Sequence, residues 1–194
     1  MTLRTASLGI LLALTVAAPP PSRAEDNPPP AAEGASRAKA PGFHVVDVKG
    51  DKVSLDDLLG KGPVVIDFWA TWCKPCIKEL PYLQRILDQY GKRGVQVCAV
   101  TIDSPKSQSQ VKKFVDTRNY TFRVLMDGDQ EVFHKLQGKG SIPYVVVLDS
   151  QGFMRFQHTG YVPGNEKEIE RVVVELLGGA GEAPQAEATP DTTK

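Results

Sequence analysis

The chain has 194 residues, and its 23 Lys and Arg balance 23 Asp and Glu, which gives a formal net charge of zero. It carries no basic stripe and no cluster of Lys and Arg interleaved with aromatic residues, so the sequence gives no support for nucleic-acid binding. The length suits one domain with a core of ordinary size, and there is no internal repeat.

The first 24 residues have the pattern of an export signal. Arg4 supplies a positive charge, Leu8 to Ala18 form a short apolar run, and Ser22-Arg23-Ala24 offers small residues to a peptidase. We expect residues 1–24 to be removed, which leaves the mature protein periplasmic or otherwise extracytoplasmic. The apolar run falls short of the roughly 20 residues that a spanning helix needs. Retention of this segment as an N-terminal membrane anchor is the alternative.

Two segments have the composition of disordered chain. Residues 25–42 are rich in Pro and Ala and show no hydrophobic periodicity, and residues 178–194 have the same character. Such segments cannot bury enough apolar surface to offset the entropy of ordering. The sequence therefore predicts a linker over 25–42, one folded domain over 43–177 and a disordered tail over 178–194.

Within that domain, β-branched runs alternate with amphipathic ones. A hairpin is expected over 43–53, and strands are expected over 63–70, 95–103, 121–127, 144–150 and 153–160, the last two as a hairpin. Helical patterns occupy residues 76–90, 107–119, 130–136 and 166–177. This alternation predicts an α/β fold with a largely parallel central sheet and helices on both faces, closed by an antiparallel hairpin.

Cys73 and Cys76 are separated by Lys-Pro and lie where the strand over 63–70 passes into a helix. At a helix N-terminus, unpaired backbone N–H groups and the helix dipole favour a thiolate, so Cys73 is the candidate nucleophile. Cys76 lies one turn further in and is expected to be less exposed, which suits a thiol that resolves a mixed disulfide. Pro75 fits the first helical turn because its missing N–H would have no helical partner there.

The pair also has two structural interpretations. A structural disulfide here would close so small a loop that it would restrain little unfolded-chain entropy. A zinc site usually needs a second pair of ligands, and the chain has neither a second Cys-x-x-Cys nor a His-x₃₋₅-His; the remaining candidates are Cys98, His44, His134 and His158. The context therefore favours a redox centre, and we expect no metal.

The segment DFWATWCKPC resembles the active site of the thioredoxin superfamily, and its continuation CIKELP resembles the exported TlpA/ResA branch of thiol–disulfide oxidoreductases. The resemblance covers nearly all of the predicted domain. It implies a thioredoxin fold, with a central mixed sheet flanked by helices, extra N-terminal strands and a helix-strand insertion around Ser104 to Met126.

The resemblance also assigns roles to single residues. It places Ile142-Pro143 in a cis-proline loop that faces the cysteines, where the Ile142 backbone would pair with a substrate strand. It places Asp67 where thioredoxin has a buried carboxylate that takes a proton from the second cysteine. Many members of the TlpA/ResA branch have another residue there, so this chain is closer to thioredoxin at that point. The alternative is an Asp at a strand end that is simply solvated.

Other residues near the pair have weaker assignments. Trp72 is expected to form apolar surface beside the nucleophile, whereas Trp69 is expected to pack in the core. Lys74, with Pro75, is expected to tune the thiols, and the resemblance gives Glu79 the same role; solvated side chains are the alternative for Lys74 and Glu79. Cys98 lies in an apolar strand and is expected to be a small buried hydrophobe.

The resemblance implies a reductase of disulfides in exported proteins, with the haem-site cysteines of apocytochrome c among its substrates. A membrane thiol relay is the expected electron donor, and we expect a monomer without a cofactor. The alternatives are a peroxiredoxin-like peroxidase and a copper-delivery protein of the Sco type. The first family needs a Thr three residues before its cysteine, where this chain has Ala70, and the second spaces its cysteines by three residues instead of two.

Overall fold

The computed structural model describes residues 38–178. The export signal predicted over 1–24, most of the linker predicted over 25–42 and the tail beyond residue 178 lie outside the described residues and stay predictions. Within residues 38–178, no helix is long and apolar enough to cross a membrane.

A seven-stranded sheet with the order β2-β1-β5-β4-β3-β6-β7 forms the centre of the fold. The predicted N-terminal hairpin and all five predicted strands are present. Their bounds are β1 (His44–Asp47), β2 (Lys52–Ser54), β3 (Val64–Trp69), β4 (Gln96–Thr101), β5 (Arg123–Met126), β6 (Tyr144–Leu148) and β7 (Met154–Thr159).

The sheet is mixed, as the resemblance implied, and is not the largely parallel sheet that the alternation of elements predicted. Strand β4 pairs in parallel with β3 on one side and with β5 on the other. All the other pairings between named strands are antiparallel. An alternation of strands and helices does not determine the direction of each strand. Between β5 and β6 the chain forms the short helix α3 (Glu131–Lys135), and β6 then runs antiparallel to β3.

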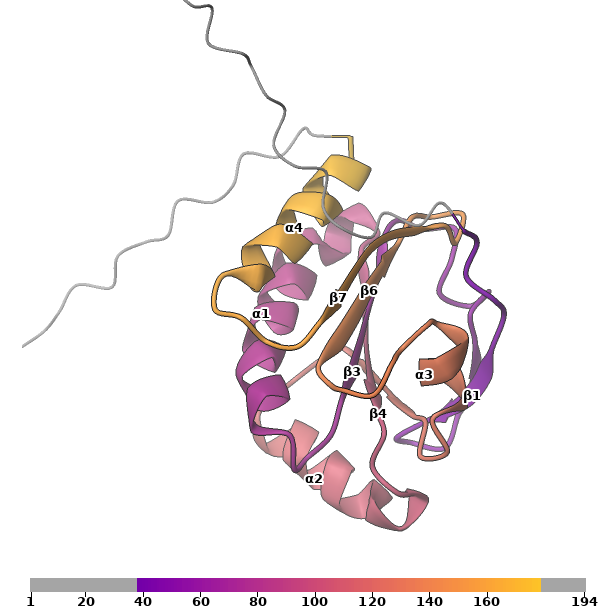
Figure 1. The fold of residues 1–194 in the computed structure, drawn as a ribbon, viewed down its shortest axis with the longest axis vertical. Coiled ribbons are helices and arrows are strands. Elements are labelled where there is room, and N and C mark those ends of the chain that lie inside the picture. The colour runs from indigo at the N-terminus through magenta and orange to yellow at the C-terminus, as the bar shows by residue number, and fades with distance from the viewer. Residues whose placement is uncertain (1–37, 179–194) are drawn as a thin grey trace, which may run out of the picture. The chain divides into compact units, whose positions relative to one another are not determined.

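Helices cover both faces of the sheet. Helices α1 (Lys74–Tyr90), α2 (Gln108–Thr117) and α4 (Asn165–Leu176) pack on one face, and α3 lies on the other (Figure 1). All of β3 is buried, and its side chains alternate between the two layers. Val65 and Trp69 face α1, whereas Ile66 and Phe68 face α3. By this alternation Asp67 lies on the α1 side.

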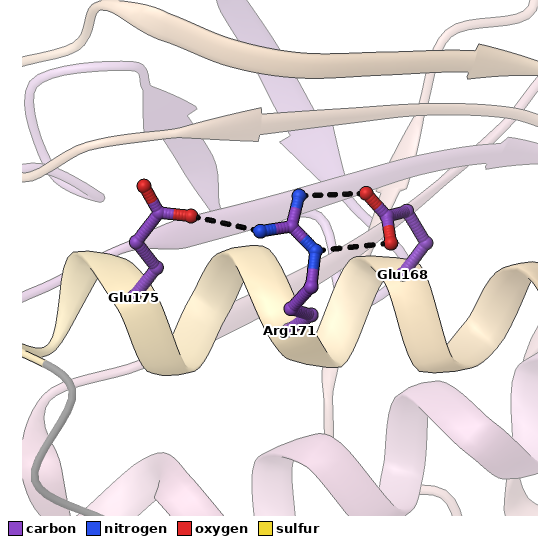
Figure 2. A network of polar contacts seen from close by, with 3 residues as sticks. All are labelled: Glu168, Arg171 and Glu175. Carbon is purple, nitrogen blue, oxygen red and sulfur yellow. Dashed lines mark hydrogen bonds and ion pairs between the residues drawn. The ribbon is translucent and has the colours of Figure 1, made fainter. Parts of the chain in front are cut away.

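An ion-pair network lies on the solvent side of α4. Arg171 contacts Glu168 at 2.7 Å and Glu175 at 3.0 Å, and all three side chains are substantially exposed (Figure 2). Exposed pairs of this kind contribute at most about 1 kcal/mol. The apolar face, with Ile169 and Val173 fully buried, therefore does more to hold α4 on the sheet.

The folded unit begins before the predicted boundary at Phe43. The Ala40 N–H donates to Gly152 O at 2.8 Å, and the Met154 N–H donates to Ala38 O at 3.0 Å. The Ala40 side chain is also buried. The end of the segment predicted as linker is therefore held against the β6–β7 turn by backbone pairing, which composition alone does not reveal.

Candidate active site

The two cysteines lie at the carboxyl end of β3, where the chain enters α1. Cys73 is the N-cap of the helix, and its Sγ accepts a hydrogen bond from the Cys76 N–H at 3.3 Å. Helix α1 therefore begins at Lys74, two residues before the start predicted at Cys76. Cys73 thus lies at the helix N-terminus, as expected, where both the capping N–H and the helix dipole favour negative charge on its sulfur, and its role as nucleophile stays a prediction.

A disulfide joins Cys73 and Cys76, whose Cα atoms are 5.3 Å apart. Cys73 is 6% exposed, whereas Cys76 is completely buried in the core between the sheet and α1. Only Cys73 can therefore be reached by a substrate sulfur without opening the helix. The two cysteines have the unequal access that the sequence predicted.

The loop before β6 faces the cysteines. The Ile142–Pro143 peptide bond is cis, and Ile142 O lies 3.9 Å from Cys73 Sγ. A hollow of about 510 Å³ opens at this point, and its lining comprises Trp72, Cys73, Lys74, Pro75, Gly140, Ser141 and Ile142. Trp72 is 66% exposed and forms an apolar rim. Trp72 and Ile142 thus line the hollow beside Cys73, with Pro143 next in the chain, and the substrate-binding roles expected for these three residues stay predictions.

Asp67 is completely buried on the side of β3 that packs against α1. Neither of its carboxyl oxygens has a hydrogen-bond partner among residues 38–178. Burial raises the pKa of Asp67 well above its ordinary value, and the nearby Glu79 raises it further. The alternative of a solvated Asp at the strand end is therefore excluded, and its role as a proton acceptor stays a prediction.

Glu79 is also buried, with 1% of its surface exposed, so the alternative of a solvated helix glutamate is excluded as well. It lies one turn after Cys76, on the same face of α1. Its Oε2 has no hydrogen-bond partner in the described part of the chain. Burial raises the pKa of Glu79 to about 7, with a smaller contribution from Glu166. Two buried carboxyls, of which Glu79 raises the pKa of Asp67, therefore lie in the layer that holds Cys76.

We expect Glu79→Gln to stabilise the oxidised protein in a pH-dependent way. Because the folded-state pKa is raised from 4.5 to about 7, ionisation favours the unfolded chain as the pH rises through this window. Between pH 4 and pH 8 the parent should lose about 3 kcal/mol of unfolding free energy that the variant keeps. Urea unfolding at pH 4, 6 and 8 measures the difference in unfolding free energy between the two proteins. A difference that is the same at pH 4 and pH 8 would contradict the raised pKa of Glu79.

The third cysteine is separate from the pair. Cys98 is 1% exposed, and burial raises the pKa of its thiol to about 12. A thiol with this pKa is almost wholly protonated at neutral pH and is a poor nucleophile. Cys98 is thus placed as expected, as a small buried hydrophobic residue. Among residues 38–178, no three His, Cys, Asp or Glu side chains are grouped so that they could hold a metal ion.

Asp103 is a further buried carboxylate, beside the active-site loop, that the sequence pattern did not single out. Asp103 is 4% exposed and accepts two hydrogen bonds from Thr71, two residues before Cys73. A signal for it was present, because Asp103 ends the segment predicted as the strand after β3. In parallel strands the carboxyl ends meet at one edge of the sheet, where functional residues collect.

Comparison with known proteins shows the family. Residues 37–157 match the AhpC/TSA family over more than half of the chain. The chain belongs to the AhpC/TSA family. This AhpC/TSA-family protein is 36% identical over 132 residues to the thiol-disulfide oxidoreductase ResA of Geobacillus kaustophilus, covering 68% of the chain and 72% of the relative. It is 39% identical over 114 residues to ResA of Bacillus anthracis, but that match spans only 64% of the relative's length.

Solved structures with the same arrangement confirm the thioredoxin fold. A putative thiol:disulfide interchange protein DsbE from Chlorobium tepidum is 30% identical, with a TM-score of 0.67 over 74% of this chain and 98% of that chain. The thioredoxin domain of a thiol-disulfide oxidoreductase from Bacteroides vulgatus is 25% identical, with a TM-score of 0.59 over 72% and 98%. The resemblance to thiol–disulfide oxidoreductases of the ResA type is confirmed.

Proposed function

We propose that this AhpC/TSA-family protein is a thiol–disulfide oxidoreductase that reduces disulfides in exported proteins. The observation that carries the proposal is the asymmetry of the cysteine pair. Cys73 lies at a helix N-terminus at the edge of an open hollow, whereas Cys76 is sealed in the core. This arrangement permits attack by one sulfur and release by the other.

In the proposed cycle, the Cys73 thiolate attacks a substrate disulfide, forms a mixed disulfide and expels the first substrate thiolate. Asp67 then accepts the Cys76 proton, and the Cys76 thiolate attacks Cys73 Sγ. The second substrate thiolate leaves and takes up a proton. Two electrons have then passed to the substrate, and the protein holds the Cys73–Cys76 disulfide found in the structure. Burial brings the pKa of the Asp67 carboxyl closer to the pKa of a thiol, and this match eases proton transfer between the two groups.

The buried carboxyls support reduction as the direction of electron flow. A strong oxidant of this fold owes its potential to a stabilised reduced form. Here Cys76 is completely buried in the layer that contains Asp67 and Glu79. Burial and negative charge on either carboxyl both disfavour a thiolate at Cys76. Cys76 therefore adds nothing to the stabilisation that the helix N-terminus gives the Cys73 thiolate, and we expect the pair to give up its electrons.

The proposed location and partners follow from the sequence and the resemblance. The signal-like pattern of residues 1–24 supports an extracytoplasmic site of action, periplasmic in a cell with two membranes. A reductant in an oxidising compartment needs an electron supply, for which we propose a membrane dithiol relay. The proposed substrates are disulfide-containing exported proteins, with the haem-site cysteines of apocytochrome c as the specific case. We propose that the protein acts as a monomer and without a cofactor.

The test is a trapping experiment with Cys76→Ala. This variant keeps the proposed attacking sulfur but cannot resolve, so we expect it to accumulate a mixed disulfide through Cys73 with oxidised insulin and to complete no turnover. Non-reducing gels and intact mass measure the adduct, and Cys98→Ala serves as a matched control that turns over normally. Absence of an adduct at Cys73 would contradict the proposal. Cys73-dependent consumption of peroxide, or stoichiometric copper after purification, would favour the respective alternatives.

A further inference from the structure

We propose that Asp103 is a positioning residue that holds the loop carrying Trp72 and Cys73 in the geometry for attack on a substrate disulfide. The inference rests on the proposed function, because it concerns the first step of that cycle. Asp103 follows β4 at the carboxyl edge of the sheet, beside the end of β3 from which the active-site loop leaves.

The contacts of Asp103 form a closed clamp on Thr71. Asp103 Oδ2 accepts the Thr71 N–H at 2.8 Å, and Oδ1 accepts the Thr71 hydroxyl at 2.8 Å. Oδ2 also accepts the Thr101 hydroxyl at 2.7 Å, and the Asp103 N–H donates back to Thr101 Oγ1 at 3.1 Å. Both carboxylate oxygens are therefore used, and the side chain is tied to the end of β4 as well as to the loop.

The contacts of Thr71 show which substitution opens the clamp. The Thr71 N–H can only donate, so Oδ2 must accept, whereas the Thr71 hydroxyl can donate or accept. An asparagine could therefore keep its oxygen toward the Thr71 N–H and turn its N–H₂ group toward Thr71 Oγ1. Asp103→Ala removes both acceptors, and because the site is buried, water cannot readily replace the lost bonds.

The position of the clamp links it to the reacting sulfur. Thr71 lies between Ala70, whose carbonyl accepts the Cys73 N–H at 3.0 Å, and Trp72, which rims the hollow. Release of Thr71 would free this turn to move both the Cys73 sulfur and the indole surface. Misplacement of a reacting group by about 1 Å can lower a rate by up to about 100-fold. A clamp on this loop therefore acts on the rate of attack as well as on folding.

The chain provides a matched control for such a clamp. Ser54 donates both its N–H and its hydroxyl to Asp57 Oδ2, each at 2.7 Å. This is the same combination of donors from one residue to one Asp, but it lies after β2, at the edge of the sheet and three strands away from β4. Asp57→Ala therefore removes the same pair of donor contacts at an exposed site, without touching the active-site loop.

The experiment compares Thr71→Val, Asp103→Ala, Thr71→Ser and Asp57→Ala with the parent. In each reduced protein, the rate of Cys73 alkylation is followed by mass from pH 5 to 9, together with the rate of mixed-disulfide formation with insulin and the urea midpoint. We expect Thr71→Val and Asp103→Ala to slow mixed-disulfide formation about tenfold and to change the pH profile of alkylation. Thr71→Ser, which keeps the hydroxyl donor, and Asp57→Ala should follow the parent.

The two proposals fail in different ways. If Thr71→Val and Asp103→Ala keep the parental rates and pH profile while unfolding at lower urea, Asp103 is only structural and this inference is overturned. If Asp103→Ala does not fold, the isosteric Thr71→Val, with its Ser control, decides the question alone. If the parent forms no mixed disulfide with insulin, the proposed function fails, and the alkylation profiles still test the clamp because they need no protein substrate.

Discussion

Cys73→Ser is expected to abolish insulin reduction, with a loss of about 10⁴-fold or more, because the variant lacks the sulfur that forms the mixed disulfide. Cys76 cannot take over the first step, since it is completely buried behind Cys73. Turbidity from insulin reduced by the protein with dithiothreitol as donor measures the activity. The Cys73→Ser protein should retain the parental fold, because its side chain remains small and can still cap α1.

The control for this result is Cys98→Ala. Cys98 is a buried thiol outside the pair, with a pKa raised to about 12 by burial. Its removal should leave the reduction rate within about twofold of the parent, because it takes part in no step of the cycle. Insulin reduction by Cys73→Ser at the parental rate would contradict the assignment of the nucleophile. A large loss in Cys98→Ala would show that a third thiol takes part.

Asp67→Asn is expected to slow release of the substrate about 100-fold, because it removes the group that takes the Cys76 proton. The first step should be unaffected, so the variant should accumulate the mixed disulfide that the parent resolves quickly. Rapid acid quench followed by intact mass measures the lifetime of this adduct. Asp88→Asn, an exposed change on α1, is the matched control and should release substrate at the parental rate.

The same substitution has an expected effect on stability. The folded-state pKa of Asp67 is raised above its unfolded value of 3.8, so the ionisation of this group costs the parent no stability below that pH and an increasing amount as the pH rises above it. Asp67→Asn should therefore be more stable than the parent at pH 8, with the gap closing towards pH 3.8. Parental adduct lifetime together with this stability gain would contradict the catalytic role and leave only a buried, destabilising acid.

Much of the fold follows from the local sequence pattern. The apolar face of residues 166–177 predicts α4, because a helix that packs on a sheet buries one face. The β-branched runs predict the central strands, because these strands are buried on both faces. The direction of β6 does not follow, since side-chain periodicity is the same for parallel and antiparallel strands. The ordered backbone at Ala38 to Ala40 was also missed, because its pairing depends on a turn more than 100 residues away.

The parts of the candidate site that a short stretch of sequence encodes were predicted correctly in position. The motif around Cys73 places both cysteines, whereas the burial of Glu79 depends on how α1 rotates against the sheet. The clamp between Thr71 and Asp103 joins residues 32 positions apart, so no spacing rule in either segment reveals it. The strand-end position of Asp103 was the available signal. It required knowing that β4 is the neighbour of β3.

The reduction potential of the Cys73–Cys76 couple tests the central claim most directly. The mature protein would be equilibrated in thiol–disulfide buffers, alkylated and read by mass, with Cys98→Ala as a background that contains only the pair. We expect a potential below about −220 mV, towards the thioredoxin end of the scale, as a dedicated reductant requires. A value near about −120 mV would make the protein an oxidant, and the absence of a reversible transition would refute the redox function itself.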